Sequence, residues 1–116
     1  FKIIVSSYQD EQRKRFAIAQ ELGHLFLHMG YKTNAEIWEK QADKVPFQEK
    51  DPEKVRQANE FAAALLMPRY IFFLTLEAAS DIAESGKRTI HMQAVADFFN
   101  VSLSAAYTRA KDFGII

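Results

Sequence analysis

The pattern of apolar and polar positions predicts one strand followed by a series of helices. Residues 1–7 form an apolar, β-branched run that is typical of a strand. A helix is predicted to begin near Glu11, with Asp10 as its N-cap, and to end at Gly30. Apolar residues recur three and four positions apart on more than one side of this helix. It is therefore predicted to lie at the centre of the fold.

The next pattern is less regular and then helical again. Residues 31–51 have neither a helical nor a strand period, apart from a partial helix or short strand around Trp38. A helix is predicted over residues 52–67, with Pro52 in its first turn, and we expect Phe61 and Leu65 to pack against the earlier helix. Three more helices are predicted downstream, at residues 70–84, at residues 91–99, and from Ser102 or Ser104 to Phe113.

Composition limits the classes of function. A chain of 116 residues that is 48% hydrophobic can form a single domain with its own core, over residues 1–116. Fifteen basic and fifteen acidic residues cancel, which disfavours a general binder of nucleic acid or of a membrane surface. The absence of cysteine excludes disulfides and thiolate metal sites, and apolar runs fall short of the roughly 20 residues that cross a bilayer. We expect a soluble cytoplasmic protein.

The candidate chemistry lies in the first helix, where residues 15–28 read Arg-Phe-Ala-Ile-Ala-Gln-Glu-Leu-Gly-His-Leu-Phe-Leu-His. The zinc-protease motif His-Glu-x-x-His places two imidazoles on one metal ion, beside a Glu that takes a proton from the bound water. Glu21 and His24 stand at the second and last positions of this motif, but Gln20 replaces the first His. A neutral amide is a poor zinc ligand, so the sequence predicts a lost or weakened metal site.

A second motif, Ala-Asn-Glu-Phe-Ala-Ala-Ala-Leu-Leu-Met-Pro, follows at residues 58–68. In order and approximate spacing, the two motifs together resemble the ImmA/IrrE family of small zinc metallopeptidases, and the resemblance covers most of the chain. It implies an α+β, mostly helical fold. The expected parts are a zincin-like metallopeptidase core, a short strand or small sheet, and a helix-turn-helix-like pair at residues 88–116.

The resemblance also implies a third zinc ligand, a Glu about four residues before the Asn of the second motif. Val55 occupies that position, and Gln57 is the neighbouring candidate two residues before Asn59. On a helix, Glu53 and Glu60 point about 140 to 160° away from Val55, so neither is a ready substitute. Two of the three ligands that the family uses are therefore expected to be absent.

For two residues of the first helix, His28 and Glu21, there are alternative interpretations. His24 and His28 have metal-binding spacing, but Leu25 would then stand in the place of the general base. The favoured alternative is that His28 is partly buried and hydrogen-bonded to the backbone. Glu21 would be the general base of an active relative. Without zinc, its expected role is a carboxylate hydrogen-bonded to Gln20, His24 or the backbone.

The C-terminal pair has the pattern of a helix-turn-helix, with Asn100 as a left-handed turn residue and Ala106 where the helices meet. The second helix offers Arg109 and Lys111 against Asp112, which is a poor set for reading bases. The favoured role of the pair is packing within the domain, and direct DNA binding is not expected.

These observations predict a catalytically degenerate ImmA/IrrE-like domain that acts as a regulatory protein-binding module and needs no cofactor. By the resemblance, its partner is a helix-turn-helix transcriptional regulator or a protein encoded nearby, of a stress-response locus or mobile element. The alternative is an active zinc metallo-endopeptidase that cleaves such a repressor, with zinc held by a substitute ligand such as Glu60 or His28. A DNA binder is the third hypothesis, and would show a steep salt dependence.

Overall fold

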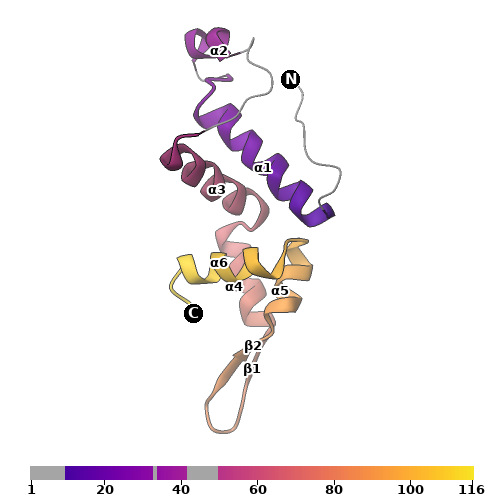
Figure 1. Ribbon diagram of the computed structural model, residues 1–116. Helices are drawn as coiled ribbons and strands as arrows, with labels where there is room; N and C mark the ends of the chain where they lie inside the picture. The colour runs from indigo at the N-terminus through magenta and orange to yellow at the C-terminus, as the bar shows by residue number, and fades with distance from the viewer. Residues whose placement is uncertain (1–9, 33, 42–49) are drawn as a thin grey trace. The chain divides into compact units, whose positions relative to one another are not determined.

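The computed structural model describes residues 10–32, 34–41 and 50–116, so the strand predicted at residues 1–7 lies outside the described residues. The described elements are, in chain order, α1 (Glu11–Leu27), α2 (Ala35–Gln41), α3 (Pro52–Leu66), α4 (Arg69–Ala78), β1 (Ser80–Ile82), β2 (Arg88–Ile90), α5 (Met92–Phe99) and α6 (Leu103–Asp112) (Figure 1). The chain divides into two compact units, Phe1–Ala62, here called unit 1, and Ala63–Ile116, called unit 2.

The helix that carries the first motif begins and ends close to its predicted limits. At the start of α1, the Asp10 side chain accepts a hydrogen bond of 2.8 Å from the backbone nitrogen of Arg13. After α1, Gly30 adopts a left-handed φ of 77°, and a Cβ there would lie 2.5 Å from the backbone oxygen of Asn34. Glycine is therefore required at this position. The short helix α2 includes Trp38, which confirms the partial helix predicted there.

In unit 1, α1 and α3 approach each other closely because small residues line their contact. A Cβ on Gly23 would lie 3.1 Å from the Cβ of Phe61 and 3.2 Å from the Cα of Ala58. Ala58 and Ala62 are the buried residues of α3. The rings of Phe26 and Phe61 lie 6.3 Å apart between the two helices. The predicted contact of Phe61 with α1 is therefore confirmed.

Leu65 is half exposed, and its contact with α1 stays a prediction. The last turn of α3 belongs to unit 2, where Ala63 and Leu66 pack against the apolar cluster of that unit. Adjacent residues of a helix point about 100° apart, so Leu65 does not share the direction of Leu66.

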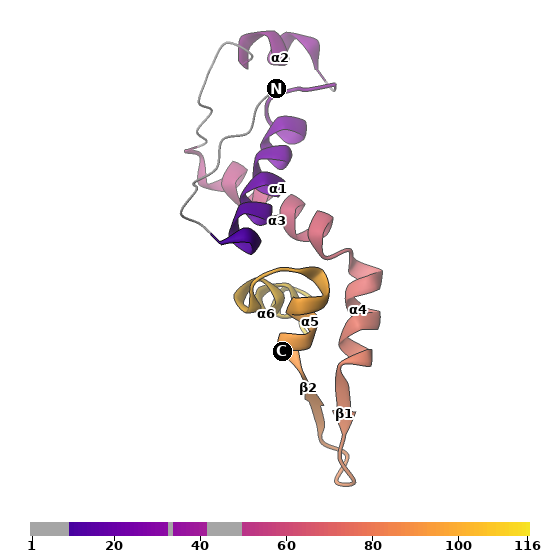
Figure 2. The same cartoon turned by 90° about the vertical axis from the view of Figure 1, so that its right-hand side faces the viewer.

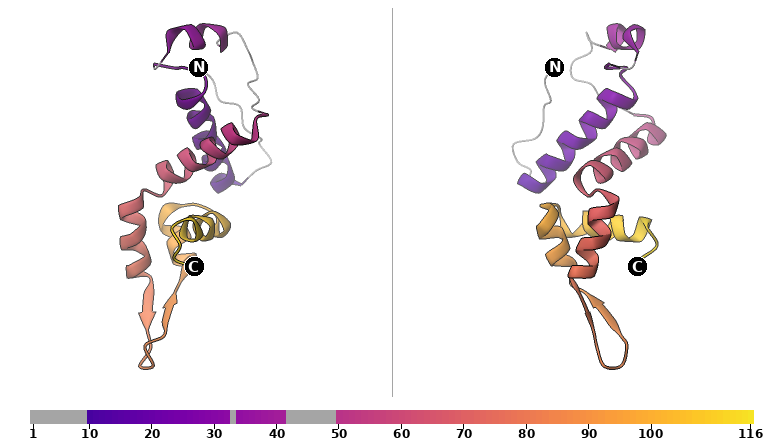
Figure 3. Two further views of the ribbon diagram at one scale, coloured as in Figure 1. Left: turned by 90° about the vertical axis from the view of Figure 1, so that its left-hand side faces the viewer. Right: turned by 180° about the vertical axis from the view of Figure 1, so that it is seen from behind.

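The prediction of one helix over residues 70–84 is wrong after Ala78. The structure ends α4 at Ala78 and places an antiparallel hairpin next, in which Ser80 pairs with Ile90 and Ile82 with Arg88 (Figures 2 and 3). After Ala79 the apolar helical period stops and Ile82 stands alone, while β-branched residues at 89–90 supply a partner strand. The small sheet of the described chain therefore follows α4.

Unit 2 has an apolar core built from all three of its helices. Its fully packed members are Met67, Phe72, Leu76, Met92, Val95, Ala96, Phe99, Val101, Ala106 and Ala110. Asn100 ends α5 with a left-handed φ of 53°, as predicted, and the Ser102 side chain accepts from the Ala105 nitrogen at the start of α6. Ala106 is fully buried in this core.

The described chain is mostly helical, with six helices and one two-stranded antiparallel sheet. This confirms the mostly helical class with a small sheet, whereas the zincin-like core remains a prediction. Among the described residues no single helix is long and apolar enough to cross a membrane, and only α3 and α4 taken together, as a bent pair, reach that length and composition.

Candidate functional site

Two side chains of the first helix and its C-terminal cap, Gln20 and His28, bond to α3 within unit 1. Gln20, at the position of the first motif His, donates a hydrogen bond from its amide nitrogen to the side-chain oxygen of Asn59 on α3. This bond joins one residue of each sequence motif. The Asn59 partner was not predicted for Gln20, although its place in the second motif was the available signal.

The two histidines form a short hydrogen-bonded chain that also ends on α3. His24 is buried, with 6% of its surface exposed, and its Nδ1 lies 2.9 Å from Nδ1 of His28. His28 Nε2 lies 2.8 Å from the side-chain oxygen of Gln57. His28 is half-buried, as expected. Its ring bonds to the side chains of His24 and Gln57, whereas bonds to the backbone were expected.

The order of donors and acceptors in this chain follows from Gln57. An amide oxygen only accepts, so a neutral His28 donates from Nε2 and carries its lone pair on Nδ1. Nδ1 of His24 must then be the donor between the two rings, which leaves the lone pair of a neutral His24 on Nε2. The tautomer of the motif histidine is thus set by a glutamine on the other helix.

Glu21 lies beside this network and is half-buried. Burial raises the pKa of its carboxyl group, because removing water disfavours the charged form. The groups expected to bond to it are directed elsewhere: the Gln20 amide nitrogen to Asn59, and His24 Nδ1 to His28. Burial, rather than a hydrogen bond, is therefore what raises the pKa of Glu21.

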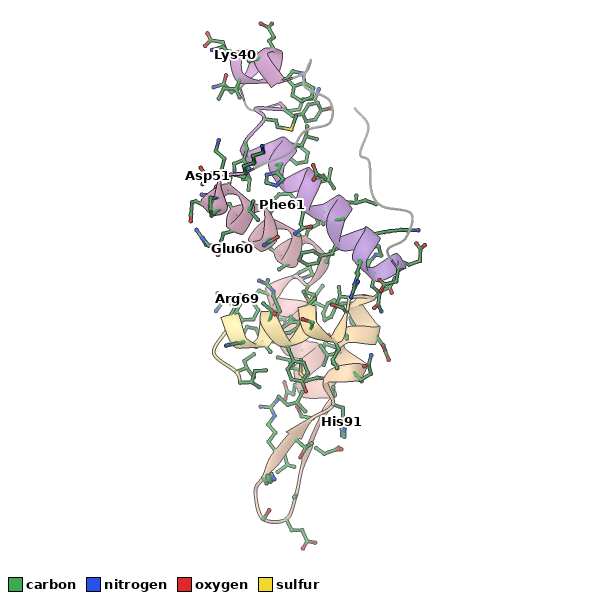
Figure 4. The ribbon with its side chains drawn as sticks, viewed as in Figure 1. Lys40, Asp51, Glu60, Phe61, Arg69 and His91 are labelled. Atoms are coloured by element: carbon green, nitrogen blue, oxygen red, sulfur yellow. The ribbon has the colours of Figure 1, made fainter. Side chains whose placement is uncertain are left out.

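The acids of α3 face away from the histidines and pair with one arginine. Arg56 donates from Nε to Glu53 over 3.0 Å, and its terminal nitrogens pair with Glu53 and Glu60. The hydrogen bond from Arg56 lowers the pKa of Glu53, and the two acids raise that of Arg56. Glu60, considered above as a substitute ligand, is thus held in an exposed ion pair (Figure 4).

The structure brings together only part of the predicted site. His24, His28 and Gln57 of α3 form one hydrogen-bonded chain, and Gln20 is bonded separately to Asn59. Val55, 37% exposed, and Glu60 belong to neither. Gln57 is the α3 side chain that reaches the histidines. In the part of the chain that the structure describes, no three or more His, Cys, Asp or Glu side chains come together as a group that could hold a metal ion.

Comparison with known families gives one match, which spans nearly the whole chain. The model of a peptidase family described as the IrrE N-terminal-like domain matches residues 2–111. This range includes both sequence motifs and the helices of unit 2. No curated protein and no solved structure matches the chain.

Proposed function

The chain belongs to the IrrE N-terminal-like domain family, and we propose that it is a catalytically degenerate member that acts as a cytoplasmic, regulatory protein-binding module. Its proposed partner is a helix-turn-helix transcriptional regulator or a protein encoded nearby. The observation that carries the proposal is the bond between Gln20 and Asn59. Where a zinc peptidase needs an imidazole, this chain has an amide that is bonded to the opposite helix.

The chemistry of the donors does not fit a catalytic zinc site. Such sites use three protein ligands plus a water, drawn from imidazole, carboxylate and thiolate groups. Here the network supplies two neutral amides, from Gln20 and Gln57, and His28 is bonded at both ring nitrogens. A carboxylate such as Glu21 cannot by itself make hydroxide, because the pKa of free water lies far above that of a carboxyl group. Peptide hydrolysis therefore lacks its nucleophile.

The same contacts explain how the site can persist without a metal ion. Gln20 with Asn59, and His28 with Gln57, are two side-chain bonds between α1 and α3. Both join the two helices that carry the family motifs. A surface built on these helices does not need a metal to keep its shape, which suits a domain that holds a partner rather than cutting it.

Restoring the missing ligands tests the degenerate site. Gln20→His supplies the first motif imidazole beside His24, and two imidazoles alone bind zinc weakly. The family resemblance favours Val55→Glu as the second change, whereas the contact to His28 favours Gln57→Glu. We expect the Gln20→His, Gln57→Glu double variant to retain stoichiometric zinc through dialysis, and the Gln20→His single variant to lose it.

The measurement is elemental analysis of zinc in the unmodified protein, the Gln20→His single variant and both double variants, after identical loading. The Gln20→His, Val55→Glu variant is the matched control, because it adds the same two groups with the carboxylate on an exposed position. Stoichiometric zinc in the unmodified protein, or proteolysis of a repressor by it that a chelator abolishes, would establish the alternative of an active zinc metallo-endopeptidase.

The partner side of the proposal has its own experiment. The regulator encoded beside this gene is mixed with the unmodified protein in the presence of a chelator, and complex formation is measured by titration calorimetry. We expect a complex and an intact regulator. Binding that disappears with the chelator, or cleavage of the regulator, contradicts a metal-independent binding module.

A further inference from the structure

Two arginines of unit 2 converge on one aromatic ring. The Cζ of Arg109, on α6, lies 4.3 Å from the centroid of Phe113, and that of Arg69, the first residue of α4, lies 5.6 Å from the same centroid. Arg69 also lies over the ring of Phe73, which is 5.1 Å from that of Phe113. Guanidinium groups are attracted to aromatic faces, so this pair of rings fixes two positive charges near each other.

Arg109 is held in place by a further bond. Its Nε donates to the backbone oxygen of Met67 over 3.1 Å, which leaves the two terminal nitrogens as its remaining donors. Burial lowers the pKa of Arg109, Asp112 opposes this, and the positive charge of Arg69 adds to it. The two guanidinium groups thus repel each other, and an anion between them would relieve that repulsion.

The charge of Asp112 acts on Arg109, but among the described residues no carboxylate is close enough to form an ion pair with either arginine. Arg13 and Arg56 each pair with a carboxylate of their own helix or its cap. Arg69 and Arg109 form no ion pair with any described residue, and unit 2 is described throughout. Arg69 is exposed and Arg109 is half-buried, and the planar donors of both match the two oxygens of a carboxylate.

The surroundings of Arg69 are apolar. Tyr70, which follows it on α4, is 75% exposed, and Phe73 and Leu74, one turn further on, are also exposed. Large apolar side chains next to unpaired positive charge are typical of surfaces that bind peptides. A surface for duplex DNA instead needs a stripe of several basic residues, and α6 places Asp112 beside Lys111.

We propose that Arg69 and Arg109, with the exposed apolar residues of α4, form a docking site for an acidic peptide segment. A carboxylate of the segment lies between the two guanidinium groups, and a neighbouring apolar side chain contacts Phe73. The site uses residues of unit 2 alone. It therefore goes beyond the proposed function of the α1 and α3 residues, and its failure would leave the zinc experiment unchanged.

The test measures the affinity of the whole chain for a fluorescein-labelled peptide that has four Glu around one central Phe, by fluorescence anisotropy. The same peptide with Gln in place of Glu, and a labelled DNA duplex, are run beside it. We expect the acidic peptide to bind more tightly than the other two. Arg69→Gln should weaken its binding by about two- to fivefold, because one charged partner is lost.

Lys87→Gln is the matched control, since it removes one exposed positive charge of unit 2 away from the aromatic rings. Arg69→Lys keeps the charge but loses the planar fork, so its affinity should fall between those of the unmodified protein and Arg69→Gln. Arg109→Gln also removes the bond to Met67, and for this reason the exposed Arg69 carries the test. Circular dichroism establishes that each variant is folded.

Three results would overturn the proposal. The first is an equal affinity of Arg69→Gln and Lys87→Gln for the acidic peptide. The second is equal binding of the Gln-containing peptide, which would assign the surface to apolar contacts alone. The third is tighter binding of the DNA duplex that Arg69→Gln abolishes, which would assign the arginine pair to phosphate groups.

Discussion

Unit 2 buries large apolar side chains from α4, α5 and α6 in one cluster, with Phe72 and Val95 fully enclosed, whereas α1 and α3 of unit 1 meet through small residues and polar side chains. Figure 3 lets the reader follow each set of helices separately. The contact of α1 with α3 depends on Gly23 against Ala58 and Phe61. Around it lie the amide and imidazole bonds of the candidate site.

This difference shows where the chain can change its chemistry without losing its fold. Apolar burial is proportional to area and has no fixed direction, so the cluster of unit 2 needs no particular polar partner. Hydrogen bonds between α1 and α3 are directional, so a donor on one helix can be replaced when its acceptor on the other is replaced with it. Gln20 with Asn59 is one such pair, at a position where the family motif has a metal-binding His.

The largest effect is expected in the cluster of unit 2. Phe72 is fully buried and its ring lies near those of Phe99 and Phe113, so Phe72→Ala removes a large apolar side chain and leaves a cavity. We expect a loss of about 3 to 5 kcal/mol in the free energy of unfolding, measured by urea denaturation. Phe98→Ala is the control, because Phe98 is 65% exposed. Similar losses for both variants would show that the cluster is not the main source of stability.

A smaller effect is expected where α1 and α3 meet. A side chain at position 23 has to displace the backbone of Ala58 and the Cβ of Phe61, because its own Cβ would lie within 3.2 Å of each. Gly23→Val should lower the free energy of unfolding by about 1 to 3 kcal/mol through overpacking. Ala64→Val, on an exposed position of α3, is the control for adding a branched side chain to a helix. No difference between the two would mean that the helices separate easily.

Much of the helical fold could be predicted from the sequence, because local signals fixed it. Asp10 and Ser102 are N-caps, Asn100 is a left-handed turn residue, and Pro52 begins α3, and all four have short-range physical reasons. The hairpin after α4 could not be predicted in the same way. It depends on the pairing of residues distant along the chain, such as Ser80 with Ile90, and no apolar period marks it.

The candidate site was predictable only in part, for a related reason. The motif spacing identified Gln20 and His24 on α1, since residues four apart share a helix face. Which α3 residue meets them depends on how the two helices pack, and that contact sets Gln57 rather than Val55 against His28. Similarly, Arg69 and Arg109 are forty residues apart, and only the packing of Phe73 on Phe113 brings them together.

The polar bonds of unit 1 should each contribute less than the apolar contacts. Gln57→Leu keeps the approximate volume but removes the acceptor for His28 Nε2, which is half-buried. The expected loss is about 1 to 2 kcal/mol, since a donor is left without its partner. Gln93→Leu is the matched control, because Gln93 donates to Asp97 within one exposed turn of α5. An equal, small effect of both changes would argue that the network does not join the two helices.

The smallest effect concerns Glu21, and its sign depends on pH. Burial raises the pKa of Glu21 in the folded protein above the unfolded value of 4.5, so the folded state disfavours the ionised form. The charge therefore begins to cost stability as the pH rises through the unfolded value, and the cost is complete above the folded pKa. Glu21→Gln should be more stable than the unmodified protein at neutral pH, by less than about 0.5 kcal/mol because solvent still reaches the carboxyl group. Well below pH 4.5 the carboxyl group is protonated in both states, and the advantage should vanish.

Thermal denaturation of the two proteins across this pH range measures the difference. Glu77→Gln, on an exposed position of α4, controls for the change in net charge. If Glu21→Gln is instead less stable at neutral pH, then the carboxylate makes a stabilising contact across α1 and α3. The stability of unit 1 would then depend on a third polar residue of the motif. Substituting its polar residues would cost more stability than the comparison with unit 2 implies.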